Sequence, residues 1–182
     1  MMLALSLWRP WCWAFFHANK RVENRGWKPP AKVIGQWVAM HAALRFDDEA
    51  HHRMTHGHYG EAPVSCPPDG IGHPVGIVGA MLIAGAFLHP DHDPGAAPGT
   101  MMMEVGRTLT QEARQLDTFA FGPWCWVIKH VVELATPIPC KGMQGLWAVA
   151  PHAEAIIREA IASDCGGCAS ASGVPELHTC GQ

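Results

Sequence analysis

The sequence predicts an α+β fold, a mixed β-barrel of about five to seven strands with short helices packed around it. Three observations favour this fold: many short apolar or alternating segments, segments rich in helix formers between them, and Gly- and Pro-rich stretches that separate the two kinds. A chain of 182 residues is long enough to bury one core. We expect one domain over residues 1–151, a C-terminal helix over 152–163 and a flexible Gly/Ser/Cys-rich tail over 164–182.

The first segments predict a strand, a helix and a second strand. Residues 2–7 are apolar and end shortly before Pro10, as expected of a short buried strand. Pro10 suits the first turn of a helix because the N–H that it lacks has no partner there, and residues 11–18 then form that helix. Residues 20–27 alternate between the two faces of a strand, which the proline pair at 29–30 ends.

The middle of the chain predicts a strand, a helix, a loop and a long strand. Residues 35–41 alternate as a strand does, whereas residues 42–54 are charged and suit a helix. Residues 55–74 contain Gly, Pro and His without a period and predict a loop. Residues 75–88 are rich in Ile, Val, Ala and Gly. We favour a barrel strand with glycines at close approaches, and a buried helix is the alternative.

The last third of the chain predicts two strands and the C-terminal helix. Residues 89–100 form a Pro/Gly/Asp loop, and residues 101–116 are helical or partly disordered. Residues 121–134 predict a strand, and residues 145–149 predict the final one. Residues 152–163 contain good helix formers after an acidic start.

Charge is distributed unevenly along the chain. The formal net charge of −3 argues against a protein that coats nucleic acid electrostatically. The first 35 residues nevertheless contain one acid, Glu23, and six basic residues: Arg9, Lys20, Arg21, Arg25, Lys28 and Lys32. A local positive patch on an acidic body suits contact with a few phosphates, and a solvated basic face without a partner is the alternative.

The sequence favours a cytoplasmic protein that does not contact a membrane. Arg9 and Pro10 interrupt the apolar start, and no small-residue cleavage pattern follows, so we expect no signal peptide. The apolar stretches are too short to span a membrane. The 7 cysteines are scattered along the chain, which suits reduced thiols.

Lys20, Glu23 and Arg25 form the motif with the clearest chemistry. Glu23 and Arg25 lie two apart, on one face of a strand, so their charges can pair. Lys20 would lie on the other face unless the turn before the strand redirects it. Arg25 offers a planar fork for phosphate or a base edge. Lys20 could neutralise phosphate or act as a general base, and Glu23 could accept from an exocyclic amine or act as its acid/base partner. The alternative is an internal network of ion pairs that fixes the barrel.

The tryptophans are candidates for stacking on a base, because each offers a large flat face. Such stacking stabilises binding by ~1–3 kcal/mol per base. Trp8 and Trp11 are favoured because they flank Arg9, which could itself contact the ligand. Trp124 and Trp126 are further candidates, and packing in the core is the alternative for all four.

Several segments, in order, resemble the ASCH family. The segment from Ala18 to Arg25 matches the family signature G-x-K-x-x-E-x-R at Lys20, Glu23 and Arg25, with alanine in place of the glycine. The other similar segments are Leu5-Ser6-Leu7-Trp8-Arg9-Pro10-Trp11, Val38-Ala39-Met40-His41-Ala42, Pro137-Ile138-Pro139-Cys140-Lys141-Gly142 and Gly145-Leu146-Trp147. The resemblance spans residues 3–149, and residues 45–118 match only by strand pattern.

The resemblance implies a PUA-like β-barrel with a cleft and a role in RNA binding. It also places His41 beside the cleft, where it could bond a ligand, with a core histidine as the alternative. Lys141 could bring an amine to the cleft mouth, or be a solvated turn residue. Some small bacterial members hydrolyse an acylated cytidine, and they carry a threonine where this chain has Glu23.

Our leading hypothesis is a protein that binds RNA or a modified nucleotide without a cofactor. The first alternative is a hydrolase, an amidohydrolase acting on a modified nucleoside such as an N4-acylated cytidine or a ribonuclease, with Lys20 and Glu23 as the acid/base pair. The second is a protein-interaction module. The sequence leaves open whether the protein is an enzyme, and its oligomeric state.

Two groups of residues have types that bind metal, but we expect no metal at either. One group gathers four histidines that we expect at the surface: His51, His52, His56 and His58. The other has the inventory of a zinc knuckle in the tail: Cys165, Cys168, His178 and Cys180. The tail lacks the apolar residues that would form a small core around the ion.

Overall fold

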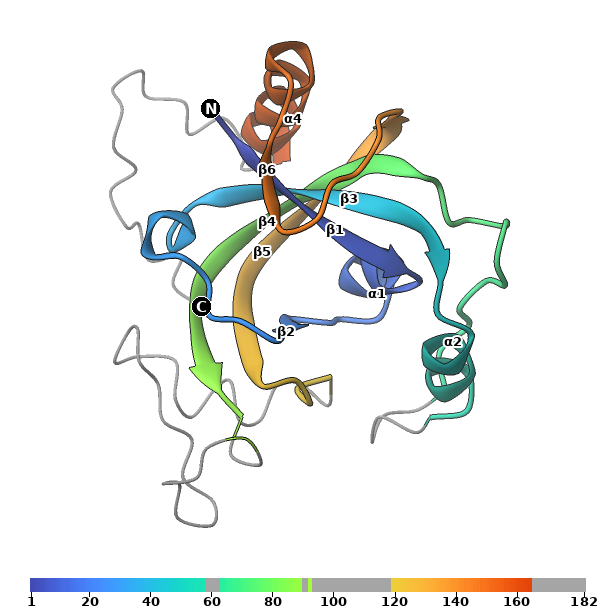
Figure 1. Ribbon diagram of the computed structural model, residues 1–182. Helices are drawn as coiled ribbons and strands as arrows, with labels where there is room; N and C mark the ends of the chain where they lie inside the picture. Colours follow the sequence, from blue (N-terminus) through green and yellow to red (C-terminus); the bar gives the residue numbers. More distant parts are fainter. Residues whose placement is uncertain (58–62, 90–91, 93–118, 165–182) are drawn as a thin grey trace.

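The computed structural model describes residues 1–57, 63–89, 92 and 119–164. Within them, six strands form one mixed sheet in the order β2-β5-β4-β3-β1-β6 (Figure 1). Strands β1 and β3 run parallel, and the other neighbours are antiparallel. The bounds of the strands are β1 Leu3–Arg9, β2 Val22–Arg25, β3 Trp37–Phe46, β4 Gly76–Leu88, β5 Trp124–Ile138 and β6 Leu146–Ala148.

The sheet is curled into a half-barrel, which confirms the predicted α+β class. In Figure 1, strands β3, β4 and β5 curve around α1 (Trp11–His17). The short strand β2 ends the sheet on one side and β6 ends it on the other, so β2 and β1 do not pair as neighbouring strands. The barrel therefore stays open along a seam between β1 and β2.

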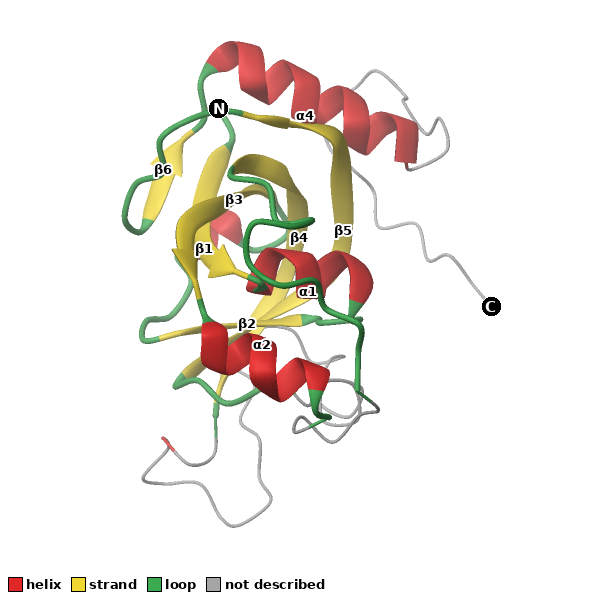
Figure 2. Ribbon diagram, turned by 90° about the vertical axis from the view of Figure 1, so that its right-hand side faces the viewer, coloured by secondary structure: helices red, strands yellow, loops and turns green. Residues whose placement is uncertain are grey.

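Among the described residues, three helices pack on the sheet or at its ends, and a short 3-10 turn (η1, Ala31–Val33) precedes β3. Helix α1 lies on the concave face, where Cys12 and Phe15 join the main core. Helix α2 (Asp48–Thr55) and helix α4 (Pro151–Asp164) lie at opposite ends of the molecule in Figure 2. No helix in the described part of the chain has the length and hydropathy that a membrane crossing requires.

A row of alanines lets α4 approach the convex face of the sheet. Ala39 pairs with Ala4 on one side and with Ala80 on the other, so the three small side chains lie side by side. All three pack in one cluster with Ala153 and Ile157 of α4. Small side chains on a sheet allow the backbone of a covering helix to come close, which buries the helix face efficiently.

Strand β4 confirms the predicted strand, and the alternative of a buried helix is wrong. Its residues are apolar on both faces because each face is covered: Met81 and Ile83 lie in the core with α1, and Ile77 lies in the cluster under α4. Gly79 is required at a close approach. A Cβ there would lie 2.2 Å from the carbonyl oxygen of Val132.

The predicted helix over residues 42–54 was wrong in its first half. Strand β3 continues to Phe46, because Ala42 pairs with Gly76 of β4 and Phe46 pairs with Arg9 of β1. The helix begins at Asp48, after Asp47 caps it by accepting a 3.0 Å hydrogen bond from the backbone N–H of Ala50. Sheet pairing on both sides thus outweighs the local helix propensity.

Strand β5 also differs from its predicted bounds. Strand β5 begins three residues later and ends four residues later than expected, because its pairing with β4 runs as far as Ile138 opposite Ile77. The final strand and the C-terminal helix lie where they were predicted. The segment predicted as helical or disordered over 101–116 and the tail beyond residue 164 lie outside the described residues.

Candidate functional site

A cleft of about 270 Å³ opens at the seam of the half-barrel. Strand β6 pairs only with Leu3–Leu5 of β1, so the second half of β1 faces β2 across the cleft. The lining residues come from β1, α1, the turn after α1, β2, the cap of α2 and the loop before β5. They are Ser6, Leu7, Trp8, Trp11, Lys20, Glu23, Asn24, Arg25, Asp47 and Phe121.

The turn after α1 directs Lys20 inward. Asn19 has a φ of 51°, in the left-handed region that asparagine tolerates better than most residues, and the backbone N–H of Lys20 donates to the carbonyl of Ala14 at 3.1 Å. The Lys20 side chain is consequently only 1% exposed. Its ammonium donates to the carbonyl of Val22 and lies 3.4 Å from Oε2 of Glu23.

Aromatic rings surround the buried ammonium of Lys20. Its Nζ lies 4.3 Å from the ring centroid of Phe15, 5.5 Å from that of Trp11 and 6.0 Å from that of Phe119. The negative faces of aromatic rings attract a cation, and this attraction strengthens when water is excluded. The rings, the Val22 carbonyl and the Glu23 carboxylate together offset the cost of burying the charge.

Glu23 lies between two cations. While Oε2 contacts Lys20, Oε1 lies 3.0 Å from Nε of Arg25, although that N–H is not aligned for a hydrogen bond. The pairing of Glu23 with Arg25 agrees with their spacing along one face of β2. Burial raises the pKa of the Cys12 thiol behind this cluster, so Cys12 remains protonated at neutral pH.

Arg25 links the two sides of the seam. Its Nη2 donates to the backbone carbonyl of Ser6 at 2.8 Å, which connects β2 to β1. Its Nη1 makes no hydrogen bond to any residue that the structure describes, and the side chain is 22% exposed. Arg25 therefore keeps donors that can point into the cleft.

Asn24 fixes the loop before β5 as a wall of the cleft. Its Oδ1 accepts from the backbone N–H groups of Phe121, at 3.0 Å, and Gly122, at 2.8 Å. Its Nδ2 donates to the carbonyl of Phe119 at 2.7 Å. These bonds bring Phe119 and Phe121 beside β2, although almost a hundred residues separate them in the sequence.

Two tryptophans add flat surfaces to the cleft. Trp8 projects from β1 with 44% of its surface exposed. Trp11 is held on both sides: its Nε1 donates to Oδ2 of Asp47 at 3.2 Å, and its ring centroid lies 5.8 Å from that of Phe121. Both predicted stacking residues thus line the cleft, whereas Trp126 is fully buried in the core.

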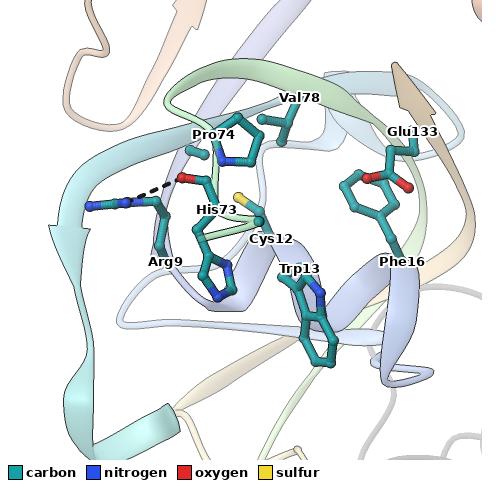
Figure 3. A pocket seen from close by; sticks show the side chains of 10 residues that line it. Arg9, Cys12, Trp13, Phe16, His73, Pro74, Val78 and Glu133 are labelled. Atoms are coloured by element: carbon teal, nitrogen blue, oxygen red, sulfur yellow. Dashed lines mark hydrogen bonds between the residues drawn. The ribbon is translucent and has the colours of Figure 1, made fainter. Parts of the chain in front are cut away.

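Arg9 lies apart from the cleft, beside a small pocket of about 20 Å³ on the other side of α1 (Figure 3). The side chain is buried, and it donates to the carbonyls of Ala43 at 2.9 Å and His73 at 3.2 Å. It also forms a 2.8 Å ion pair with Asp69. This pocket has room for about one water molecule, and Arg9 fixes the loop before β4.

His41 and Lys141 do not line the cleft either. His41 is buried, shares a 3.3 Å hydrogen bond with the carbonyl of Cys140, and packs edge-on against Trp147. Burial lowers the pKa of His41. Gly142 lies so close to the ring that a Cβ there would be 2.3 Å from Cε1 of His41. The side chain of Lys141 is exposed to solvent.

The histidines predicted at the surface belong to α2 and its end. His51 is half-buried and bonds the carbonyl of Cys66 at 3.0 Å, whereas His52 and His56 are exposed, with ring centroids 4.0 Å apart. His58 and the cysteine-containing tail lie outside the described residues.

Five lining residues were missed by the sequence prediction: Ser6, Leu7, Asn24, Asp47 and Phe121. Asp47 had a local signal, because an Asp followed by acidic residues is typical of a helix start. Phe121 had none, since its place depends on the pairing of β2 with β5.

The charges of the cleft balance, since Lys20 and Arg25 face Glu23 and Asp47. The cleft can therefore take a flat neutral ring between its aromatic walls and satisfy the ring's polar edge with Arg25 and Glu23. No protein-family model matches the chain, and no curated protein matches its sequence. The residues of the cleft are thus the basis for a functional hypothesis.

Proposed function

We propose that the protein binds one base of RNA, or of a modified nucleotide, in the cleft between β1 and β2. The observation that carries this proposal is the combination of the Lys20–Glu23–Arg25 cluster with the exposed ring of Trp8 in one cleft, whose charges balance once Asp47 is included. The resemblance of this motif to the ASCH family supports the same conclusion, as well as a PUA-like form of the half-barrel.

The size of the cleft favours a single nucleoside unit. Sites for drug-sized ligands have volumes from about 300 Å³ upward, and this cleft, at about 270 Å³, lies just below that range. It can hold one base and part of its sugar, but not several nucleotides in a row. An RNA ligand would therefore present one unstacked base to the cleft.

Polar groups of the cleft select a base edge rather than a phosphate. Lys20 is too deeply buried to reach a phosphate and instead holds the Glu23 carboxylate in place. Glu23 can accept from an exocyclic amine, while the remaining donors of Arg25 face a ring nitrogen or carbonyl. Trp8 stacks on the face of the base, which stabilises binding by ~1–3 kcal/mol.

Fluorescence anisotropy of labelled single-stranded RNA tests the proposal, with unlabelled nucleosides as competitors. We expect Trp8→Ala and Arg25→Gln to weaken binding about five- to a hundredfold. Lys32→Gln is the matched control for Arg25→Gln, because it removes the same charge from an exposed residue outside the cleft. We expect it to have little effect at moderate salt.

Two results would contradict the proposal. One is an absence of binding to RNA and to every nucleoside tested, which would favour the alternative of a protein-interaction module. The other is equal weakening by Arg25→Gln and Lys32→Gln, which would indicate diffuse electrostatic attraction without use of the cleft.

Hydrolysis is the second candidate, because the 3.4 Å contact between Lys20 Nζ and Glu23 Oε2 joins two groups that can exchange a proton. In an amidohydrolase reaction, water would add to the amide carbonyl of an N4-acylated cytidine and release the acid and the free amine. Release of acetate from N4-acetylcytidine, lost in Lys20→Met while the fold and binding are retained, would support this function. Cleavage of labelled RNA would test the ribonuclease alternative.

Thiol chemistry supports a cytoplasmic setting for this function. Cys12, Cys66 and Cys140 are free thiols, and burial raises the pKa of Cys66 to about 11, which makes it unreactive at neutral pH. Free thiols persist where the environment is reducing. Fractionation of cells that express the protein would test this location.

A further inference from the structure

Arg45 lies at the rim of the cleft, stacked on Trp8. It is near the end of β3, and its Cζ is 3.5 Å from the centroid of the Trp8 ring. Trp8 lines the cleft, and so does Asp47, which follows Arg45 by two residues. Arg45 itself is exposed to solvent. At this separation the guanidinium lies over the ring face, which restrains its position.

Within the part of the chain that the structure describes, the donors of Arg45 are not used. Among the described residues, Arg45 makes no hydrogen bond and has no carboxylate within ion-pair distance. The cations below it differ: Lys20 contacts Val22 and Glu23, and Arg25 contacts Ser6 and Glu23. A guanidinium that is held in place and keeps its donors is suited to binding an oxyanion through two parallel hydrogen bonds.

We infer that Arg45 is a phosphate-binding residue, so that the cleft takes a phosphorylated nucleotide, free or within an RNA strand, in preference to a nucleoside. This inference rests on the proposed function. The interior of the cleft is charge-balanced and receives the base. In a nucleotide the phosphate is attached through the ribose, to the side of the base, which places it at the rim. Trp8 then contacts the base, while Arg45 beside it contacts the phosphate.

The alternative role for Arg45 is to support the ring of Trp8. The two roles differ in their effect on ligands with and without phosphate. A supporting residue affects stacking, so its loss weakens nucleosides and nucleotides alike. A phosphate-binding residue affects only the phosphorylated ligand, and only that contact depends on salt.

Isothermal titration calorimetry with the four ribonucleosides and their 5′- and 3′-monophosphates tests the inference, at low and moderate salt. The proteins are wild type, Arg45→Gln and Arg158→Gln. Arg158 is the matched control because it is an exposed arginine on α4, outside the cleft. We expect a monophosphate to bind wild type about tenfold or more tightly than its nucleoside, since charged hydrogen bonds contribute that much. Arg45→Gln should remove this advantage and leave nucleoside binding unchanged, and Arg158→Gln should retain the advantage.

Equal binding of nucleoside and monophosphate by wild type would overturn the inference while leaving the proposed function in place. Equal weakening of both ligands in Arg45→Gln would also overturn it, in favour of support for Trp8. An absence of binding to nucleosides, nucleotides and RNA would instead overturn the proposed function, and the inference with it. Thermal unfolding of each variant checks that the fold is retained, as expected for changes at exposed side chains.

Discussion

Replacing Glu23 by glutamine should destabilise the protein far more than replacing its partner Lys20 by methionine. In Glu23→Gln the ammonium of Lys20, 1% exposed, loses its anion and cannot reach water. In Lys20→Met the carboxylate keeps Arg25, 3.0 Å away, and methionine fills a space that already has apolar walls. The asymmetry follows from the position of Glu23 between two cations.

The expected magnitudes follow from the burial of the pair. Removing one partner of a buried ion pair costs about 3–5 kcal/mol when the other charge is left alone. The Val22 carbonyl and the ring of Phe15 still contact the ammonium in Glu23→Gln, so we expect a loss of about 3 kcal/mol, at the lower end of that range. We expect Lys20→Met to cost about 1 kcal/mol, because replacing a buried charge by an apolar side chain is often close to neutral.

Urea unfolding followed by tryptophan fluorescence measures these losses in wild type, both single variants and the double variant. We expect the double variant to lose less than the sum of the two single losses, by about 1–3 kcal/mol. Glu159→Gln, at an exposed site on α4, should change stability by less than about 0.5 kcal/mol. Additive losses, or a Glu23→Gln variant as stable as wild type, would refute the proposed dependence of Lys20 on Glu23.

Three further predictions concern Gly142, the buried histidines and Asn24. Gly142→Ala should lower the free energy of unfolding by about 1–3 kcal/mol, because its Cβ would lie 2.3 Å from Cε1 of His41. Gly26→Ala is the control, because a Cβ there would have open space around it. It should change stability little in the same thermal unfolding experiment. Burial lowers the pKa of His41 and of His73, so the unfolded chain binds more protons than the folded protein near pH 6. The free energy of unfolding should therefore fall as the pH decreases through about 6.5. Urea unfolding between about pH 5 and pH 7.5 should show a smaller dependence on pH in His41→Gln than in wild type. Asn24→Ala should lower stability by about 1–3 kcal/mol because three backbone groups of the loop lose their partner, and calorimetry should also show weaker ligand binding because Phe121 is released.

The geometry of the Lys20–Glu23–Arg25 cluster could be predicted from the sequence to a large extent. Glu23 and Arg25 lie two positions apart, so their side chains point to the same face of the strand, where they form an ion pair. The orientation of Lys20 required a turn that redirects it, and Asn19 before it is a residue type that adopts the left-handed conformation readily. Local rules were sufficient here because every member of the cluster lies within one short segment.

Other parts of the site depend on contacts between distant segments, which no local pattern contains. The loop that carries Phe121 reaches the cleft only because β2 pairs with β5. Arg9 was expected at the ligand because it lies between Trp8 and Pro10 in the sequence. Strand alternation instead turns its side chain away from that of Trp8, so Trp8 is exposed and Arg9 is buried. The rule that explains Arg9 was available from the sequence, whereas the position of Phe121 required the sheet order.

The bond between Arg25 and Ser6 determines how the cleft can change its width. Adjacent strands of a sheet separate only when a ladder of backbone hydrogen bonds breaks together. Here the described hydrogen bond across the seam comes from one side chain, Nη2 of Arg25 to the carbonyl of Ser6. A rotation of that side chain can lengthen the gap between β1 and β2 and leave the rest of the sheet paired. Under the proposed function, a base would enter from the side at the cost of this hydrogen bond, ~0.5–1.5 kcal/mol, without local unfolding of a strand.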